Sequence, residues 1–134
     1  MIRFILVIVS FFSLNFAYGH GVHDSGNVKS QKGGIIRSLE TIHVEFVSIG
    51  NKIQVYIFSK DKKPKPLATK DYPATAKVIL PRGGAEKKIE LTAKADYWEA
   101  EYDAKGIHRY TFEFYIEQGG HKDKLKFTVE PKKG

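Results

Sequence analysis

The sequence predicts an all-β protein, and three observations support this. Apolar and polar residues alternate over several short segments, which is the pattern of half-buried strands. Turn residues, chiefly glycine, recur between these segments at roughly the spacing of a β-sandwich, about ten residues. No window after the N-terminal segment shows the spacing of an amphipathic helix.

The clearest pair of strands lies in residues 41–58, which we expect to form a hairpin. Gly50-Asn51 supplies a tight turn between two alternating runs. The side chains expected to face inward are Ile42, Val44, Phe46, Ile53, Val55 and Ile57.

The rest of the chain continues the same pattern. A polar loop over residues 59–72, stiffened by Pro64 and Pro66, precedes a strand at residues 74–80. Further strands are expected at residues 87–92, 97–102 and 107–117, and a last one places Leu125, Phe127 and Val129 inward. We therefore predict an immunoglobulin-like, Greek-key β-sandwich of about seven to eight strands over residues 35–130, followed by a basic tail at residues 131–134.

Residues 1–19 have the pattern of a secretory signal peptide. Arg3 supplies a positive charge, residues 4–14 are apolar, and Ala17 and Gly19 are small residues before a cut after Gly19. The alternative is an uncleaved membrane anchor, but residues 4–18 are only 15 residues, and a membrane-spanning helix needs about 20. We expect a periplasmic or secreted protein that begins at His20 and has no transmembrane segment, with a flexible leader over residues 20–34 rich in glycine and histidine.

Composition excludes several kinds of chemistry. Cleavage after Gly19 leaves 115 of the 134 residues, and the net charge falls from +7 to +6 with the loss of Arg3. There is no cysteine, and the only methionine is the first residue, so thiolate and thioether metal sites are excluded. The lysines are scattered, which favours solubility and protection of strand edges over a patch that binds a polyanion or an anionic membrane surface. We expect no nucleic-acid partner. No Gly-x-Ser-x-Gly, His-Glu-x-x-His or phosphate-binding glycine loop is present, so we expect no enzyme activity.

The histidines are the remaining candidates for distinctive chemistry. As a new N-terminus, His20 offers an α-amino group and a ring nitrogen, and His23 adds a third nitrogen ligand for Cu(II), Zn(II) or Ni(II). Asp24 offers an oxygen, and His121, in a turn, is a further candidate if it lies at the same end of the sandwich. The alternative is that His20 and His23 are only solvated residues of a flexible leader.

Other polar and aromatic residues are expected to be structural. His43 should be exposed beside Glu45 on a polar strand face, and His108 should cap the core through a hydrogen bond. The aromatic residues exceed what one core needs, and exposed ones can stack on a sugar or bind a partner protein. Most are nevertheless expected to complete the core and its rim: Tyr56, Phe58, Tyr72, Tyr97, Trp98 and Tyr115.

A family resemblance rests on three segments. They are the glycine pair Gly33-Gly34, the hairpin IHVEFVSIGNKIQVYIFSKDKKPKP, and the strand-turn-strand AKVILPRGGAEKKIEL. Over residues 32–129 the chain resembles small exported Ig-like domains associated with bacterial heavy-metal (copper, zinc, nickel) efflux and resistance systems. Similar chains often carry histidine before the glycine pair, where this chain has Lys32.

The resemblance implies weak binding or delivery of a divalent metal, with an envelope or efflux-system protein as partner. The main alternative is a protein-interaction module of the envelope that binds no metal. A third reading is a copper oxidase acting on polysaccharide through an N-terminal histidine brace, which needs a second histidine from the sandwich: His43, His108 or His121.

Overall fold

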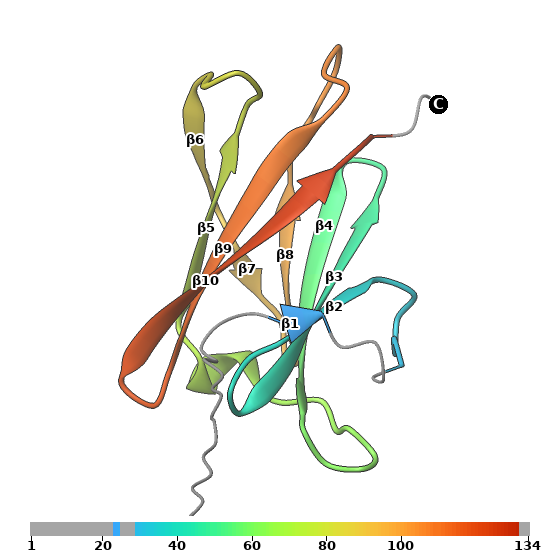
Figure 1. Ribbon diagram of the computed structural model, residues 1–134, viewed down its shortest axis with the longest axis vertical. Helices are drawn as coiled ribbons and strands as arrows, with labels where there is room; N and C mark the ends of the chain where they lie inside the picture. The colour runs from blue at the N-terminus through green and yellow to red at the C-terminus, as the bar shows by residue number, and fades with distance from the viewer. Residues whose placement is uncertain (1–22, 25–28, 132–134) are drawn as a thin grey trace, which may run out of the picture.

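The computed structural model describes residues 23–24 and 29–131. The predicted signal peptide, His20 and the end of the basic tail lie outside the described residues. Over the described part the chain forms two antiparallel sheets that pack face to face (Figure 1). The prediction of an all-β sandwich is therefore confirmed.

The larger sheet has six strands in the order β1-β2-β3-β4-β8-β7, and the smaller has four in the order β10-β9-β5-β6. A single turn of 3-10 helix, η1 (Thr69–Asp71), lies between β4 and β5. The strands are β1 (His23–Asp24), β2 (Ile35–Ser38), β3 (Ile42–Ile49), β4 (Lys52–Ser59), β5 (Ala74–Ile79), β6 (Glu86–Ile89), β7 (Thr92–Ala93), β8 (Tyr97–Glu101), β9 (Tyr110–Gln118) and β10 (His121–Val129).

The core lies between the two sheets and is built from the inward residues of the alternating segments. Phe46 of the six-stranded sheet stacks on Phe127 of the four-stranded sheet, with ring centroids 4.5 Å apart. Trp98 meets Phe114 across the same interface, edge to face at 5.3 Å. Such pairs add about 1 kcal/mol each beyond the burial of their surface, so the aromatic residues help to hold the layers together.

The hairpins follow the predicted turns. β3 pairs with β4 from Ile42 opposite Ser59 to Ile49 opposite Lys52, which confirms the hairpin predicted at residues 41–58. β9 and β10 are joined through Gly119 and Gly120, whose φ angles of 55° and 86° are open to glycine at little cost.

The return strand predicted at residues 87–92 is instead two short strands in different sheets. β6 pairs with β5 in the four-stranded sheet, whereas β7 pairs with β8 in the six-stranded sheet. Leu91 packs against the core where the chain crosses between the layers. Alternation reports which face of a strand is buried and not which sheet the strand joins, so it did not reveal the crossing.

The strand predicted to start at residue 107 begins later, at Tyr110. Ile107 instead closes a turn, with its amide donating to the carbonyl of Ala104 at 2.9 Å. His108 is exposed in this turn. The expectation that His108 caps the core is therefore wrong, because it lies before the strand whose alternation was used to place it.

Candidate functional site

The outer face of the six-stranded sheet is covered along β3. Residues 42–47 are buried in succession, so both faces of this strand are shielded from water. Val44 and Phe46 belong to the core between the sheets, and His43 and Glu45 alternate with them onto the outer face. Hydrogen bonds and a shared pocket bring residues 29–34 and the loop after β4 over these two polar side chains.

Glu45 is fully buried, and residues 30–34 surround its carboxylate with donors. The Ser30 hydroxyl donates to Oε2 at 2.6 Å. Backbone amides complete the set: Gln31 donates to Oε1 at 2.9 Å, and Lys32 and Gly34 donate to Oε2 at 2.9 and 2.7 Å. We call this segment, residues 30–34, the Glu45-bound loop. It belongs to the leader that the sequence predicted to be flexible, and a buried carboxylate holds it against the sheet.

These hydrogen bonds decide the charge of Glu45. Burial by itself raises the pKa of the carboxyl group, because it disfavours the ionised form. The Ser30 hydroxyl and the three backbone amides act in the opposite direction and hold the pKa below its ordinary value. Glu45 is therefore an ionised, fully hydrogen-bonded carboxylate at neutral pH, and its donors explain why a charge is tolerated there.

Two residues of the loop fit it closely to the sheet. A Cβ atom on Gly34 would lie 2.2 Å from the backbone oxygen of Phe46, so only glycine allows this approach. The Lys32 ammonium lies 5.0 Å from the centroid of the Tyr56 ring, within the range of a cation–π contact. Lys32 thus contacts an aromatic ring of strand β4.

His43 is buried, with 8% of its surface exposed. The expectation of an exposed strand histidine is wrong, because chain segments from outside the sheet cover the face on which it lies. Its Nδ1 atom lies 2.8 Å from the Ser38 hydroxyl of β2. Burial, together with the positive charge of Lys60, holds the pKa of His43 below its ordinary value, so the ring is neutral at pH 7.

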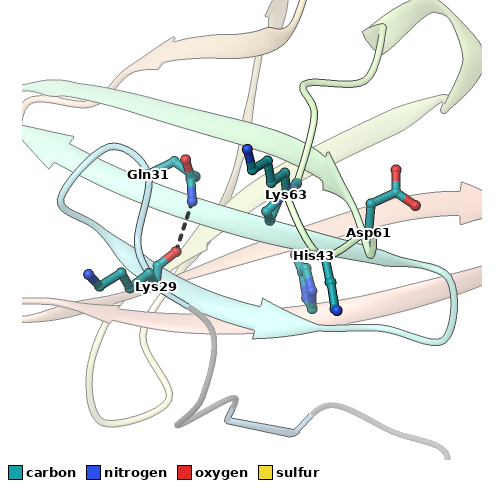
Figure 2. Close-up of a pocket in the computed structure, with 7 residues that line it drawn as sticks. Lys29, Gln31, His43, Asp61 and Lys63 are labelled. Carbon is teal, nitrogen blue, oxygen red and sulfur yellow. Dashed lines mark hydrogen bonds between the residues drawn. The ribbon is translucent and has the colours of Figure 1, made fainter.

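A pocket of about 550 Å³ opens over His43 (Figure 2). Three parts of the chain line it: the end of the leader segment, β3 and the loop that follows β4. Asp61 and Lys63 belong to the loop that follows β4, and Lys29 and Gln31 lie on the other side of His43 (Figure 2). The lining residues are Lys29, Gln31, His43, Asp61, Lys62, Lys63 and Pro64.

The described backbone brings two of the predicted metal ligands to one end of the sandwich. β1 pairs with β2 with His23 opposite Ser38, close to the turn from β2 into β3. In that turn the Thr41 hydroxyl donates to the Gln118 side chain, and Gln118 pairs with His121 at the start of β10. β1 and the β9–β10 hairpin therefore lie at the same end (Figure 1).

His121 is exposed and lies beside one carboxylate. Its Nε2 atom is 3.7 Å from Asp123, which also accepts a hydrogen bond of 2.8 Å from Gln118. Within residues 23–24 and 29–131, no three histidine, aspartate or glutamate side chains are placed to hold a metal ion.

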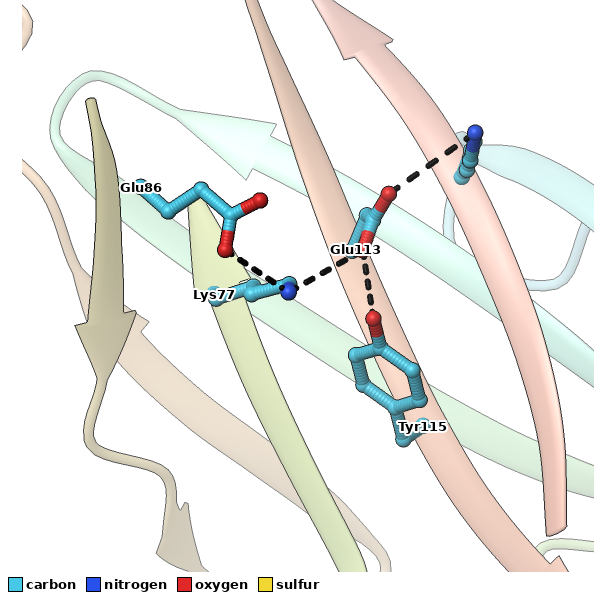
Figure 3. A network of polar contacts seen from close by, with 5 residues as sticks. Lys77, Glu86, Glu113 and Tyr115 are labelled. Atoms are coloured by element: carbon cyan, nitrogen blue, oxygen red, sulfur yellow. Dashed lines mark hydrogen bonds and ion pairs between the residues drawn. The ribbon is translucent and has the colours of Figure 1, made fainter. Parts of the chain in front are cut away.

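The outer face of the four-stranded sheet carries a second buried carboxylate (Figure 3). Glu113 is 4% exposed and lies 3.9 Å from the Lys77 ammonium and 3.8 Å from that of Lys126. The Tyr115 hydroxyl donates to it at 2.5 Å, and Lys77 also pairs with Glu86 at 2.9 Å. Every group of this network has a partner within it, which is the arrangement of a structural network.

The aromatic residues divide between the core and the sheet surface. Trp98 and Phe58 are buried, and Tyr72 packs against the core. Tyr56 stacks on Tyr97 at 4.8 Å, with Lys32 also over its ring. The half-buried tyrosines thus contact neighbours in this chain, in line with the expectation that most aromatic residues complete the core and its rim.

Sequence reasoning missed the role of Glu45 and the pocket over His43. One signal was present: an acidic residue between Val44 and Phe46 in a strongly apolar strand, preceded by the glycine pair Gly33-Gly34. The lysines of the pocket come from segments separated in sequence, and only the fold brings them together.

Comparisons with protein-family models, with curated proteins and with solved structures find no match. Among the described residues, no helix is long and apolar enough to span a membrane.

Proposed function

We propose that this protein is an exported, non-catalytic binding domain of the cell envelope that takes up a divalent metal ion weakly through His20 and His23. We further propose that the sandwich is immunoglobulin-like and that His121 contributes to the site. The observation that supports the proposal is the pairing of His23 with Ser38, which attaches the leader to the sheet at the end where the β9–β10 hairpin turns.

The chemistry of the donors agrees with this function. An N-terminal α-amino group and imidazole nitrogens form the type of set that Cu(II), Ni(II) and Zn(II) prefer. Asp123 beside His121 adds a negative charge near that end. A site built from a few nitrogen ligands, on a protein without cysteine, is suited to buffering or delivering a metal rather than storing it.

The test is a Cu(II) titration of the exported protein, followed by electron spin resonance. The intact mass of the same sample first shows whether the chain begins at His20. We expect the wild-type spectrum of nitrogen-coordinated copper to disappear in a variant with both His20→Ala and His23→Ala. An unchanged spectrum and affinity in that variant contradict the proposal.

Two single variants sharpen the result. His108→Ala is the matched control, because His108 is exposed in a loop before β9 and has no place in the proposed site. It should leave the spectrum unchanged. His121→Ala should weaken binding several-fold if its imidazole is a ligand, and an unchanged affinity removes it from the site.

The second candidate function is a protein-interaction module that binds no metal. Ile35 and Ile49, on neighbouring strands β2 and β3, are the exposed large hydrophobic residues of the described chain, at 42% and 61% exposure. This function predicts a stoichiometric envelope partner that co-purifies in metal-free buffer and is lost with Ile35→Ser and Ile49→Ser. If the double variant still retains the partner, Ile35 and Ile49 do not form the contact surface.

A further inference from the structure

The pocket over His43 has the size and composition of a ligand site. Its volume of about 550 Å³ lies within the usual range for small-molecule sites, about 300–1,000 Å³. Its walls come from residues 29 and 31, from β3, and from residues 61–64. A site built from three separate parts of the chain can surround a ligand on several sides (Figure 2).

The charge of the pocket is positive. Lys29, Lys62 and Lys63 contribute three ammonium groups against the single carboxylate of Asp61. Asp61 already accepts a hydrogen bond of 2.9 Å from the Ser59 hydroxyl. None of the three lysines forms an ion pair with a residue that the structure describes, so their charges are not neutralised within the described chain.

A fourth lysine beside the pocket has a different role. The Lys60 ammonium donates to the carbonyl oxygens of Leu39 and Glu40 at 2.8 and 3.3 Å. Lys60 thereby holds the loop to the turn between β2 and β3, and its charge still acts on His43. The surroundings of His43 repel a cation, which argues against His43 as a metal ligand.

His43 supplies a buried polar group to the pocket. Ser38 occupies the Nδ1 atom, at 2.8 Å. The Nε2 atom has no hydrogen-bond partner among residues 23–24 and 29–131. A buried ring nitrogen without a partner costs about 1–3 kcal/mol, and a ligand that accepts a hydrogen bond from Nε2–H removes this cost.

We propose that this pocket binds the oxyanion group of a small molecule, a phosphate or a carboxylate, held by Lys29, Lys62 and Lys63 with His43 Nε2 as a donor. An oxyanion offers several acceptor atoms, and charge-assisted hydrogen bonds from ammonium groups are the strong kind. This site is separate from the proposed metal site and does not depend on it.

The direct test is the titration of the histidine ring protons by NMR, with inorganic phosphate against chloride at equal ionic strength. The negative charge of a bound anion stabilises the imidazolium form of His43 more than the neutral ring, so phosphate should raise the pKa of His43 by about one unit. His108 and His121 are exposed, and they serve as controls in the same spectra. Equal responses of all three histidines, or none, overturn the proposal.

Variants locate the effect in the pocket. Lys62→Ala with Lys63→Ala, both in an exposed loop, should weaken phosphate binding about tenfold through the loss of charge-assisted hydrogen bonds. The matched control is Lys87→Ala with Lys88→Ala, which removes two exposed lysines from β6 in the other sheet. Equal weakening in both double variants shows a general effect of net charge and contradicts a site at His43.

A second titration with acetate distinguishes the two sources of the oxyanion. A response of His43 to phosphate alone assigns a phosphoryl ligand, and a response to acetate alone assigns a carboxylate ligand. If His43 responds to both phosphate and acetate, and both responses are lost in the Lys62→Ala, Lys63→Ala variant, the pocket binds oxyanions in general. If both responses survive in that variant, the proposed site is wrong.

Discussion

The Glu45 carboxylate accepts a hydrogen bond of 2.7 Å from the backbone amide of Gly34, which enters the sheet one residue before β2. The same glycine lies so close to Phe46 that no other residue fits there. The acid and the glycine thus depend on one another, because the close approach of the loop is what brings its amides to the buried carboxylate.

Replacing Glu45 with glutamine should destabilise the protein. The amide keeps the size of the side chain but loses the charge and one acceptor oxygen, and it leaves backbone amides of the loop unsatisfied. We expect a loss of about 2–3 kcal/mol in the free energy of unfolding, measured in urea. Glu86→Gln, at an exposed ion pair, is the control and should change it by less than about 1 kcal/mol.

Gly34→Ala tests the close approach separately. Its Cβ atom would meet the Phe46 carbonyl at 2.2 Å, and we expect a cost of about 3 kcal/mol from the forced shift of the backbone. Gly33→Ala is the matched control: it meets no atom within 4 Å but has a φ of 80°, which costs about 1 kcal/mol. Equal losses in the two variants would show that backbone conformation, and not space, governs this turn.

Stability should fall in acid partly because of Glu45. Its folded pKa lies below the value of 4.5 that applies to the unfolded chain, so its contribution is fully present above pH 4.5. As the pH falls further, the unfolded state takes up the proton first, and the contribution is lost as the pH passes through the lowered pKa. The difference in stability between wild type and Glu45→Gln should therefore shrink below pH 4.5, and a constant difference contradicts this assignment.

His43 should make the stability of the fold depend on pH in a second, higher pH range. The groups around it are Lys60 and the pocket residues Lys29, Asp61, Lys62 and Lys63. Its folded pKa lies below the ordinary 6.5, so stability is full above pH 6.5 and decreases as the pH falls toward the lowered pKa. His43→Gln should flatten the urea-unfolding profile in this window, whereas the exposed His108→Gln should leave it unchanged.

The pKa of the Tyr115 hydroxyl provides a test of its hydrogen bond to Glu113. The hydrogen bond to Glu113, and then burial, raise the pKa of the Tyr115 hydroxyl. Glu113→Gln removes the negative charge and should lower that pKa toward its ordinary value, as measured from the ring signals by NMR. Glu117→Gln, exposed on the same strand, should leave Tyr115 unchanged.

The alternation of apolar residues was enough to predict the sandwich. In β3 and β4 the inward residues Val44, Phe46 and Val55 are all buried in the core, as the pattern indicated. Gly119 and Gly120 likewise marked their hairpin correctly. These features are local, because strand periodicity and turn conformation depend on neighbouring residues.

The candidate sites depend on contacts between distant residues, and local patterns do not carry that information. His43 has the alternation of a polar face, yet segments that precede β2 and follow β4 bury it. Glu45 looks like a solvated strand residue until the amides of residues 31–34 are placed around it. The crossing between β6 and β7 was missed for the same reason, since strand pairing is a property of the whole fold.

The contacts of Glu45 give the leader a second attachment to the six-stranded sheet, in addition to the pairing of His23 with Ser38. Two attachments on one segment support each other, because each keeps the partners of the other at high local concentration. A substitution at Glu45 should therefore also weaken the pairing of β1 with β2, without altering any proposed donor to the metal.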